Sequence, residues 1–126
     1  MGRPDVSVDA MSTQKNVRKE AGTVEENELR LEHGKAEQIV DALNTDLAST
    51  YVLYHQLKKH HWNVEGAEFR DLHLFLGDAA GNAEEAADEI AERLQALGGA
   101  PVSSPTAQAE ASIVEHEDED VYDIRT

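Results

Sequence analysis

The sequence predicts an all-α protein built on one long antiparallel helical hairpin. Apolar residues recur at intervals of three and four over two stretches, residues 36–63 and 69–97, as expected for helices with one apolar stripe each. The composition agrees, because 5% of the residues are aromatic and the hydrophobic fraction of 40% is mainly Ala, Leu and Val. Ala-rich, aromatic-poor chains favour helices over sheets.

Residues 1–33 are polar, include Gly2, Pro4 and Gly22, and lack a sustained period, so we expect a flexible N-terminal tail. Residues 34–126 then form one helical domain, because a chain of 126 residues suits a single domain. The apolar stripe of the first helix is expected at Ile39, Val40, Leu43, Leu47, Tyr51, Tyr54 and Leu57.

The second helix is expected to follow a short link around Gly66. Gly98 and Gly99, followed by Pro101, should end it, since glycine accepts a left-handed C-terminal turn and proline resists further helix. Each helix has about 29 residues and a length of about 43 Å, so the short link folds them into a hairpin. The second stripe is expected at Phe69, Leu72, Leu76, Ala79, Ala80, Ala83, Ala87, Ile90, Leu94 and Leu97.

A short third helix is predicted after Pro101, with Ser104 as N-cap and Pro105 at the first helical position. The residues that follow it are mostly acidic. A two-helix hairpin leaves much of its apolar stripe in water unless another hairpin covers it. The sequence therefore implies either a homo-oligomer, with a dimer as the smallest assembly, or a missing second half of the bundle.

The net charge of −15, from 26 acidic and 11 basic residues, argues against nucleic-acid binding through general electrostatic attraction, because such binding needs Lys and Arg to neutralise phosphates. The absence of cysteine excludes disulfides and thiolate metal sites. No apolar run is long enough to cross a bilayer, and the N-terminus lacks the apolar core of a secretory signal. We therefore expect a cytoplasmic protein without a membrane partner.

Four of the six histidines lie within residues 54–75. At about 100° per residue, His61 falls within the first apolar stripe and His73 at the margin of the second. Asp88 and Glu92, four residues apart, lie on the same side of the second helix as His73. A lone histidine on an apolar face is more often a hydrogen-bonded core residue, and paired acids are more often solvated. Two imidazoles and two carboxylates together are donors that suit iron, zinc or manganese.

One chain cannot assemble all four donors. His73 and Asp88 are separated by about 22 Å along the helix axis, whereas ligands of one metal lie within a few ångström of each other. His61 and His73 can meet across the hairpin, because both lie near the link. We therefore expect a second copy, packed antiparallel, to bring its Asp88 and Glu92 beside the first copy's histidines. A two-fold axis then produces two identical sites.

The stretch HWNVEGAEFRDLH, followed by DEIAERLQALGG, resembles the signature of the Dps family, the mini-ferritins that protect DNA during starvation. The resemblance covers residues 36–123 and implies a ferritin-like fold. It also implies that His61, His73, Asp88 and Glu92 are the metal-binding and catalytic residues of a ferroxidase site shared by two subunits. Iron is the implied metal, oxidised preferentially by hydrogen peroxide. The family stores the ferric mineral in a twelve-subunit shell and thereby protects against oxidative stress.

Some Dps proteins carry a further acidic ligand four residues after the second histidine, where this chain has Gly77. Asp78 is adjacent and is a candidate accessory residue. Trp62 is either a packing residue or, as the family's tryptophan beside the site suggests, an interceptor of oxidising equivalents. Family members also continue for two more long helices, whereas this sequence ends at Thr126. We therefore expect a truncated bundle, or hairpins that pair into a substitute for it.

Two other functions would use the same features. The four ligands would serve a non-enzymatic zinc or manganese binder, and the hairpin alone would serve as an oligomerisation module with vestigial ligands. The many acids and few lysines also resemble salt-adapted archaeal proteins, in which concentrated salt screens the repulsion between acidic side chains.

Overall fold

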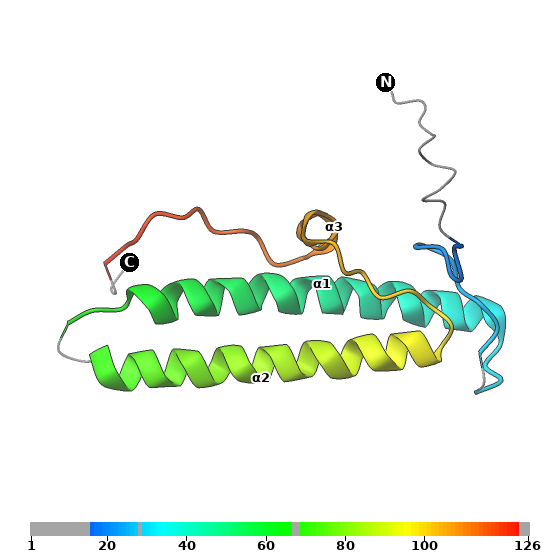
Figure 1. The fold of residues 1–126 in the computed structure, drawn as a ribbon, viewed down its shortest axis with the longest axis horizontal. Coiled ribbons are helices and arrows are strands. Elements are labelled where there is room, and N and C mark those ends of the chain that lie inside the picture. Colours follow the sequence, from blue (N-terminus) through cyan, green and yellow to red (C-terminus); the bar gives the residue numbers. More distant parts are fainter. Residues whose placement is uncertain (1–15, 28, 67–68, 124–126) are drawn as a thin grey trace, which may run out of the picture.

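The computed structural model describes residues 16–27, 29–66 and 69–123. Within these ranges the regular elements are three helices, α1 (His33–Asn63), α2 (Phe69–Ala96) and α3 (Pro105–Ala111). The all-α class is therefore confirmed. The two long helices, of 31 and 28 residues, lie side by side as an antiparallel hairpin (Figure 1).

The ends of the helices follow local chemistry. The carboxylate of Glu32 accepts a hydrogen bond from the N–H of Gly34, which caps α1. In the link between α1 and α2, Gly66 has a φ of 105°, a value that side chains rarely allow. The hydroxyl of Ser104 accepts from the N–H of Ala107, and Pro105 opens α3, as predicted.

The core between α1 and α2 consists mainly of small side chains. The buried hydrophobic residues of the two helices are Ala36, Val40, Leu47, Ala48 and Val52 from α1 and Ala80, Ala83, Ala87 and Leu94 from α2; of these, Val52 faces α3 and the segment after it. Alanine lets the two helix backbones come close, and the larger Leu47 and Leu94 are fully buried. This contact is what brings the two histidine-bearing ends of the helices together.

The expected N-terminal tail includes residues 1–15 and 28, which lie outside the described residues. Part of its remainder packs against the C-terminal end of α2. The N–H of Glu25 donates to the carbonyl of Gly98 at 2.8 Å, and the Nζ of Lys19 donates to the carbonyl of Gly99 at 2.8 Å. Gly98 has the left-handed φ of 92° that the paired glycines predicted.

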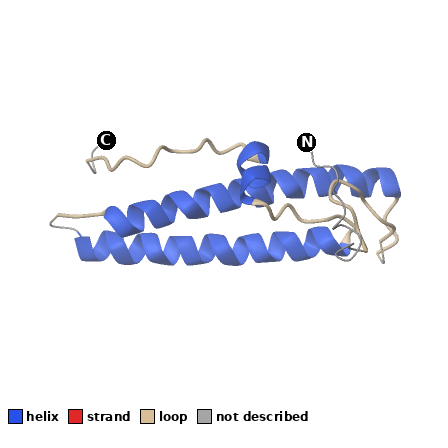
Figure 2. Cartoon of the chain, turned by 45° about the horizontal axis from the view of Figure 1, so that its top comes forward, coloured by secondary structure: helices blue, strands red, loops and turns tan. Residues whose placement is uncertain are grey.

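The chain after α2 crosses to the side of α1 that faces away from α2 (Figure 1). Asn44 holds this crossing, since its Nδ2 donates to the carbonyl of Ala100 and its Oδ1 accepts from the N–H of Val102. Residues 112–123, here called the C-terminal strap, then run along α1 toward the linked end of the hairpin (Figure 2). The strap is attached first at Ser49, whose hydroxyl accepts from the N–H of Ile113 at 2.9 Å.

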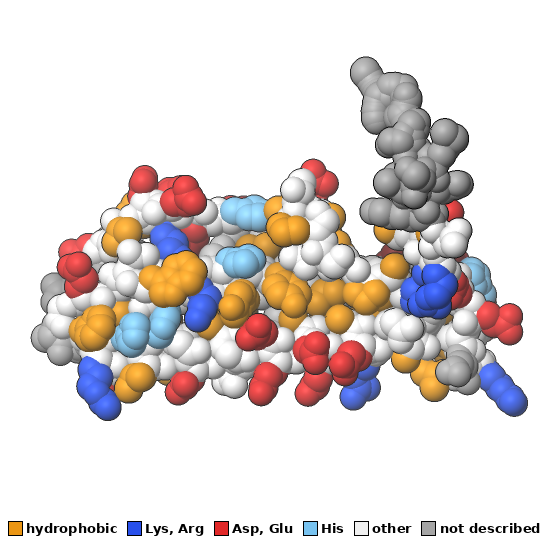
Figure 3. All heavy atoms as spheres, viewed as in Figure 1, with side chains coloured by type: hydrophobic (Ala, Val, Ile, Leu, Met, Phe, Trp, Pro, Cys, Tyr) orange, Lys and Arg blue, Asp and Glu red, His pale blue; other side chains and the backbone are white. Residues whose placement is uncertain are grey.

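The hairpin leaves several large apolar side chains in water, among them Ile39, Leu53, Phe69, Leu74 and Phe75, each at least 40% exposed. Figure 3 shows hydrophobic side chains in a row along α1, above the acidic side chains of α2. In the described part of the chain, no helix has the length and apolarity needed to span a membrane.

Candidate metal site

His61 lies in the last turn of α1 and His73 near the start of α2, so the two residues face each other at the linked end of the hairpin. Both are half-buried. Their rings stack with centroids 3.9 Å apart and planes 18° from parallel. The structure thus brings together the two histidines that the sequence predicted to meet.

Each histidine is fixed by the backbone of the other. Nδ1 of His61 lies 2.6 Å from the carbonyl oxygen of His73, and Nδ1 of His73 lies 2.8 Å from the carbonyl oxygen of His61. A carbonyl can only accept, so each Nδ1 must carry the proton and donate. In the neutral ring this assigns the lone pair to Nε2.

The two Nε2 atoms are suited to bind a metal ion. Among the described residues, neither has a hydrogen-bond partner. A metal-bound histidine commonly donates its other ring N–H to a backbone carbonyl, which fixes both the tautomer and the ring orientation. The histidine pair therefore already has the hydrogen bonds that a metal ligand needs.

Phe69 extends the stack, and nothing in the sequence pattern predicted this contact. Its ring lies 5.0 Å from that of His73, with planes 20° apart. The two residues are four apart on α2, so they are neighbours on one face of the helix. Three aromatic rings thus stack in the order Phe69, His73, His61.

The structure does not bring Asp88 and Glu92 to the histidine pair. Both side chains are exposed on α2, and Asp88 is about 22 Å from His73 by the helical rise. Within the described ranges, no group of three or more His, Asp or Glu side chains is close enough to hold a metal ion. One chain therefore provides the donors of the predicted site as two separate halves.

Neither accessory candidate is buried. Asp78 is exposed on α2. Trp62 is 68% exposed, so it is not a core residue of the hairpin, and the Nζ of Lys58 lies 5.9 Å from its ring centroid. The other histidines in the described ranges, His33, His55, His60 and His116, are exposed.

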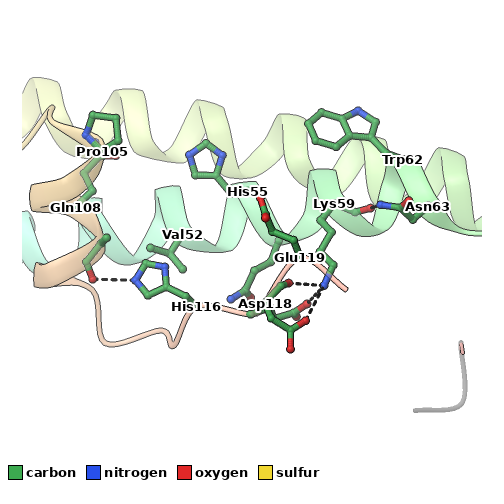
Figure 4. A pocket seen from close by; sticks show the side chains of 13 residues that line it. Val52, His55, Lys59, Trp62, Asn63, Pro105, Gln108, His116, Asp118 and Glu119 are labelled. Atoms are coloured by element: carbon green, nitrogen blue, oxygen red, sulfur yellow. Dashed lines mark hydrogen bonds and ion pairs between the residues drawn. The ribbon is translucent and has the colours of Figure 1, made fainter. Parts of the chain in front are cut away.

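A separate cavity of about 490 Å³ lies between α1, α3 and the C-terminal strap (Figure 4). It is lined by Val52, His55, Trp62 and His116 among others, and neither His61 nor His73 borders it. It therefore does not belong to the histidine pair.

Charged contacts hold the strap over this cavity. The carboxylate of Glu117 accepts from His60 at 3.1 Å and from Lys59 at 3.2 Å, and these bonds lower its pKa. The hydroxyl of Tyr122 donates to Asp118, which lowers the pKa of Asp118 and raises that of Tyr122. The contacts from the strap to α1 and the hydrogen bond within the strap are thus all present when both carboxylates are ionised and the phenol is protonated.

Comparison with known proteins identifies the family. A model of the ferritin-like domain matches residues 40–125. The DNA protection during starvation protein of Halobacterium salinarum is 74% identical over 118 residues, which are 92% of this chain and 64% of the relative.

Two solved structures give the same result. An archaeal Dps homologue from Halobacterium salinarum superposes with a TM-score of 0.84 at 68% identity, covering 90% of this chain and 63% of that one. A Dps protein from Vibrio cholerae, described as one of the ferritin-like diiron-carboxylate proteins, superposes with a TM-score of 0.70 at 29% identity, covering 78% and 62%.

The helical hairpin with a histidine pair at its linked end therefore defines a ferritin-like protein, and the chain belongs to that family. Within the family its relatives are Dps proteins, including one from a halophilic archaeon, as its acidic composition suggested. The chain spans slightly less than two thirds of the length of these relatives.

Proposed function

We propose that this chain is part of a Dps-type ferroxidase, which binds ferrous iron as its substrate, oxidises it and stores the ferric product. The observation that carries this proposal is the histidine pair, with both Nδ1 atoms bound to carbonyls and both Nε2 atoms directed to no described partner. Imidazole nitrogen and carboxylate oxygen together suit iron. The names of the relatives, which refer to DNA protection and to diiron-carboxylate proteins, support the same assignment.

The complete site is proposed to form between two copies packed antiparallel. His61 and His73 of one copy would meet Asp88 and Glu92 of the other, which removes the separation of about 22 Å within a single helix. The exposed apolar side chains on the hairpin favour such an association, because burial of apolar surface drives association in water. The relatives are longer than this chain, and we propose that their additional residues cover the surface that corresponds to this one.

The proposed reaction oxidises two ferrous ions and reduces one molecule of hydrogen peroxide. Each ferrous ion gives up one electron, the peroxide O–O bond breaks, and with two protons the two oxygen atoms leave as water. The histidines bind as neutral donors with fixed orientation, and the carboxylates offset the positive charge of the metal. Removing ferrous iron and peroxide together would protect DNA without contact, which agrees with a net charge of −15.

Ferrous iron added without oxygen, followed by peroxide, tests the activity through the rise in ferric absorbance. We expect the wild type to oxidise iron faster than buffer, and the His61→Ala, His73→Ala double variant to lose most of this rate. His55→Ala is the matched control, because His55 is an exposed histidine on the same helix outside the pair. A wild type no faster than buffer would contradict the enzymatic proposal.

A non-enzymatic zinc or manganese site is the second candidate, because the same donors suit these ions. Tight zinc binding does not separate the two, since zinc binds most nitrogen and oxygen sites more tightly than ferrous iron. The peroxide assay separates them. A protein that binds zinc at the four residues but leaves ferrous iron unoxidised would favour the second candidate, and one that binds neither would be an oligomerisation module.

A further inference from the structure

Gly77 lies against the imidazole of His61. A Cβ atom added to Gly77 would be 2.8 Å from Cε1 of His61, 3.0 Å from Nδ1 and 3.6 Å from Nε2. Real Cβ atoms essentially never approach another heavy atom as closely as 2.8 Å, so a side chain at position 77 and the present ring position exclude each other. The ring occupies the space that a side chain would fill.

Helix geometry explains why this position matters. The N–H of residue 77 bonds to the carbonyl of residue 73 in a regular α-helix. That same carbonyl accepts the Nδ1–H of His61 at 2.6 Å, so the ring must approach α2 beside residue 77. Glycine at this position leaves the carbonyl of His73 accessible to a donor from the neighbouring helix.

The ring has little freedom to move away from an added methyl group. His61 is stacked on His73 at 3.9 Å and bonded to its carbonyl, so a shift that relieves the clash breaks at least one of these contacts. His73 does not depend on residue 77 in the same way, because its Nδ1 bonds to the carbonyl of His61 at the end of α1. A side chain at position 77 should therefore disturb His61 more than His73.

We infer that Gly77 is a positioning residue, whose missing side chain lets the His61 ring bond to the carbonyl of His73 and thereby directs Nε2 of His61 outward as a ligand. The ring geometry stands on the structure alone. Its consequence for metal binding rests on the proposed function.

The experiment compares Gly77→Ala with Gly81→Ala in the full 126-residue chain. Gly81 is one helical turn away on α2, and among the described residues no atom beyond its chain neighbours and the adjacent backbone of α2 lies within 4 Å of a Cβ added there. Both variants replace a helical glycine by the residue with the highest helix propensity, so any loss of folding specific to Gly77→Ala arises from the clash.

The first measurement uses the metal-free protein at about pH 8, where ordinary histidines are neutral. Long-range ¹⁵N–¹H spectra of the imidazoles report which ring nitrogen carries the proton. We expect Nδ1-protonated His61 and His73 in the wild type and in Gly81→Ala, and a loss of this state for His61 alone in Gly77→Ala. An unchanged His61 in Gly77→Ala would overturn the inference.

The second measurement is the affinity for zinc, a redox-inactive probe. A change in the hydrogen bonding of a metal ligand typically costs about 10- to 100-fold in affinity, and we expect a loss of this size for Gly77→Ala but not for Gly81→Ala. Equal affinities in the two variants would overturn the consequence for metal binding. If no variant binds zinc and the imidazole spectra still change as expected, the proposed function fails while the positioning role of Gly77 is supported.

A third measurement detects the clash without any metal or spectroscopic assignment. In urea unfolding, Gly77→Ala should not raise the midpoint in the wild-type background, but should raise it in a His61→Ala background, where the ring is absent. Gly81→Ala should raise the midpoint in both backgrounds. A rise of equal size for Gly77→Ala in both backgrounds would contradict the proposed contact.

Discussion

His61 and His73 exchange hydrogen bonds, each ring donating from Nδ1 to the other residue's carbonyl oxygen. The carbonyl of His61 is available because α1 ends at Asn63, and the last four carbonyls of a helix lack intrahelical partners. The ring of His61 can reach the carbonyl of His73 because Gly77 has no side chain in the space that the ring occupies. The histidine pair thus depends on where one helix ends and on one glycine in the other.

Truncation of the core should separate the helices that carry this pair. We expect Leu47→Ala or Leu94→Ala to lower the free energy of unfolding by about 2 to 5 kcal/mol, because both side chains are fully buried. Urea denaturation followed by circular dichroism gives the value. Leu53→Ala is the control, since Leu53 is 43% exposed, and a loss as large as that of Leu47→Ala would contradict the described core.

Asn44 should stabilise the crossing from α2 to α3. We expect Asn44→Ala to cost about 1 to 3 kcal/mol, because it removes two hydrogen bonds and leaves the part-buried N–H of Val102 without its acceptor. Asn82→Ala, at an exposed position on α2, is the control. Amide hydrogen exchange at Val102 should accelerate in Asn44→Ala, and unchanged exchange there would count against the contact.

The C-terminal strap should be released by acid. The pKa of Glu117 is lowered below its ordinary 4.5 and that of Asp118 below 3.8, so their stabilisation is present above these values and is lost as pH falls through the lowered ones. The pKa of Tyr122 is raised above 10.0, so its contribution is present below 10.0 and is lost as pH rises through the raised value. The strap should be best ordered between these limits.

Amide exchange of residues 113–118, corrected for the intrinsic pH dependence, measures this release. Protection should fall below about pH 4 while that of the α1–α2 core persists, and Lys59→Met should weaken it at neutral pH. The groups are exposed, so salt should reduce the effect. Protection that stays constant from pH 6 to pH 3 would show that the charged contacts do not hold the strap.

Periodicity and helix-ending residues predicted much of this fold. The spacing of the apolar residues predicted where α1 ends and α2 begins at the link. Gly98 predicted the end of α2, and Ser104 predicted the start of α3. His61 and His73 were expected to meet because both lie near the link, and their positions around the helices place them at the apolar stripes.

Contacts that depend on exact backbone positions were beyond the sequence. The hydrogen bonds from each histidine ring to the other residue's carbonyl depend on the exact spacing and orientation of α1 and α2. No periodic sequence pattern encodes that spacing or orientation. The strap and the segment around Glu25 are polar and aperiodic, so nothing in their sequences indicated that they would pack against α1 and the end of α2. In the sequence, Gly77 stood out only because some Dps proteins have an acidic ligand at this position.

In the proposed assembly, one metal site takes its histidines from one copy of the chain and its carboxylates from another. Two variants test it, one with His61→Ala and His73→Ala, the other with Asp88→Ala and Glu92→Ala. Each alone should oxidise ferrous iron poorly. In a mixed dimer the histidines of the second variant meet the carboxylates of the first, which rebuilds one complete site and leaves the other with no ligands.

The deciding measurement is the ferrous-iron oxidation rate of the two variants unfolded together and refolded as a mixture. Random pairing makes half of the dimers mixed, each with one of two sites, so we expect recovery to about a quarter of the wild-type rate. Native mass measurement verifies that mixed dimers have formed. If such dimers are present and the mixture remains as inactive as its parents, the metal is not shared between copies and the account is wrong.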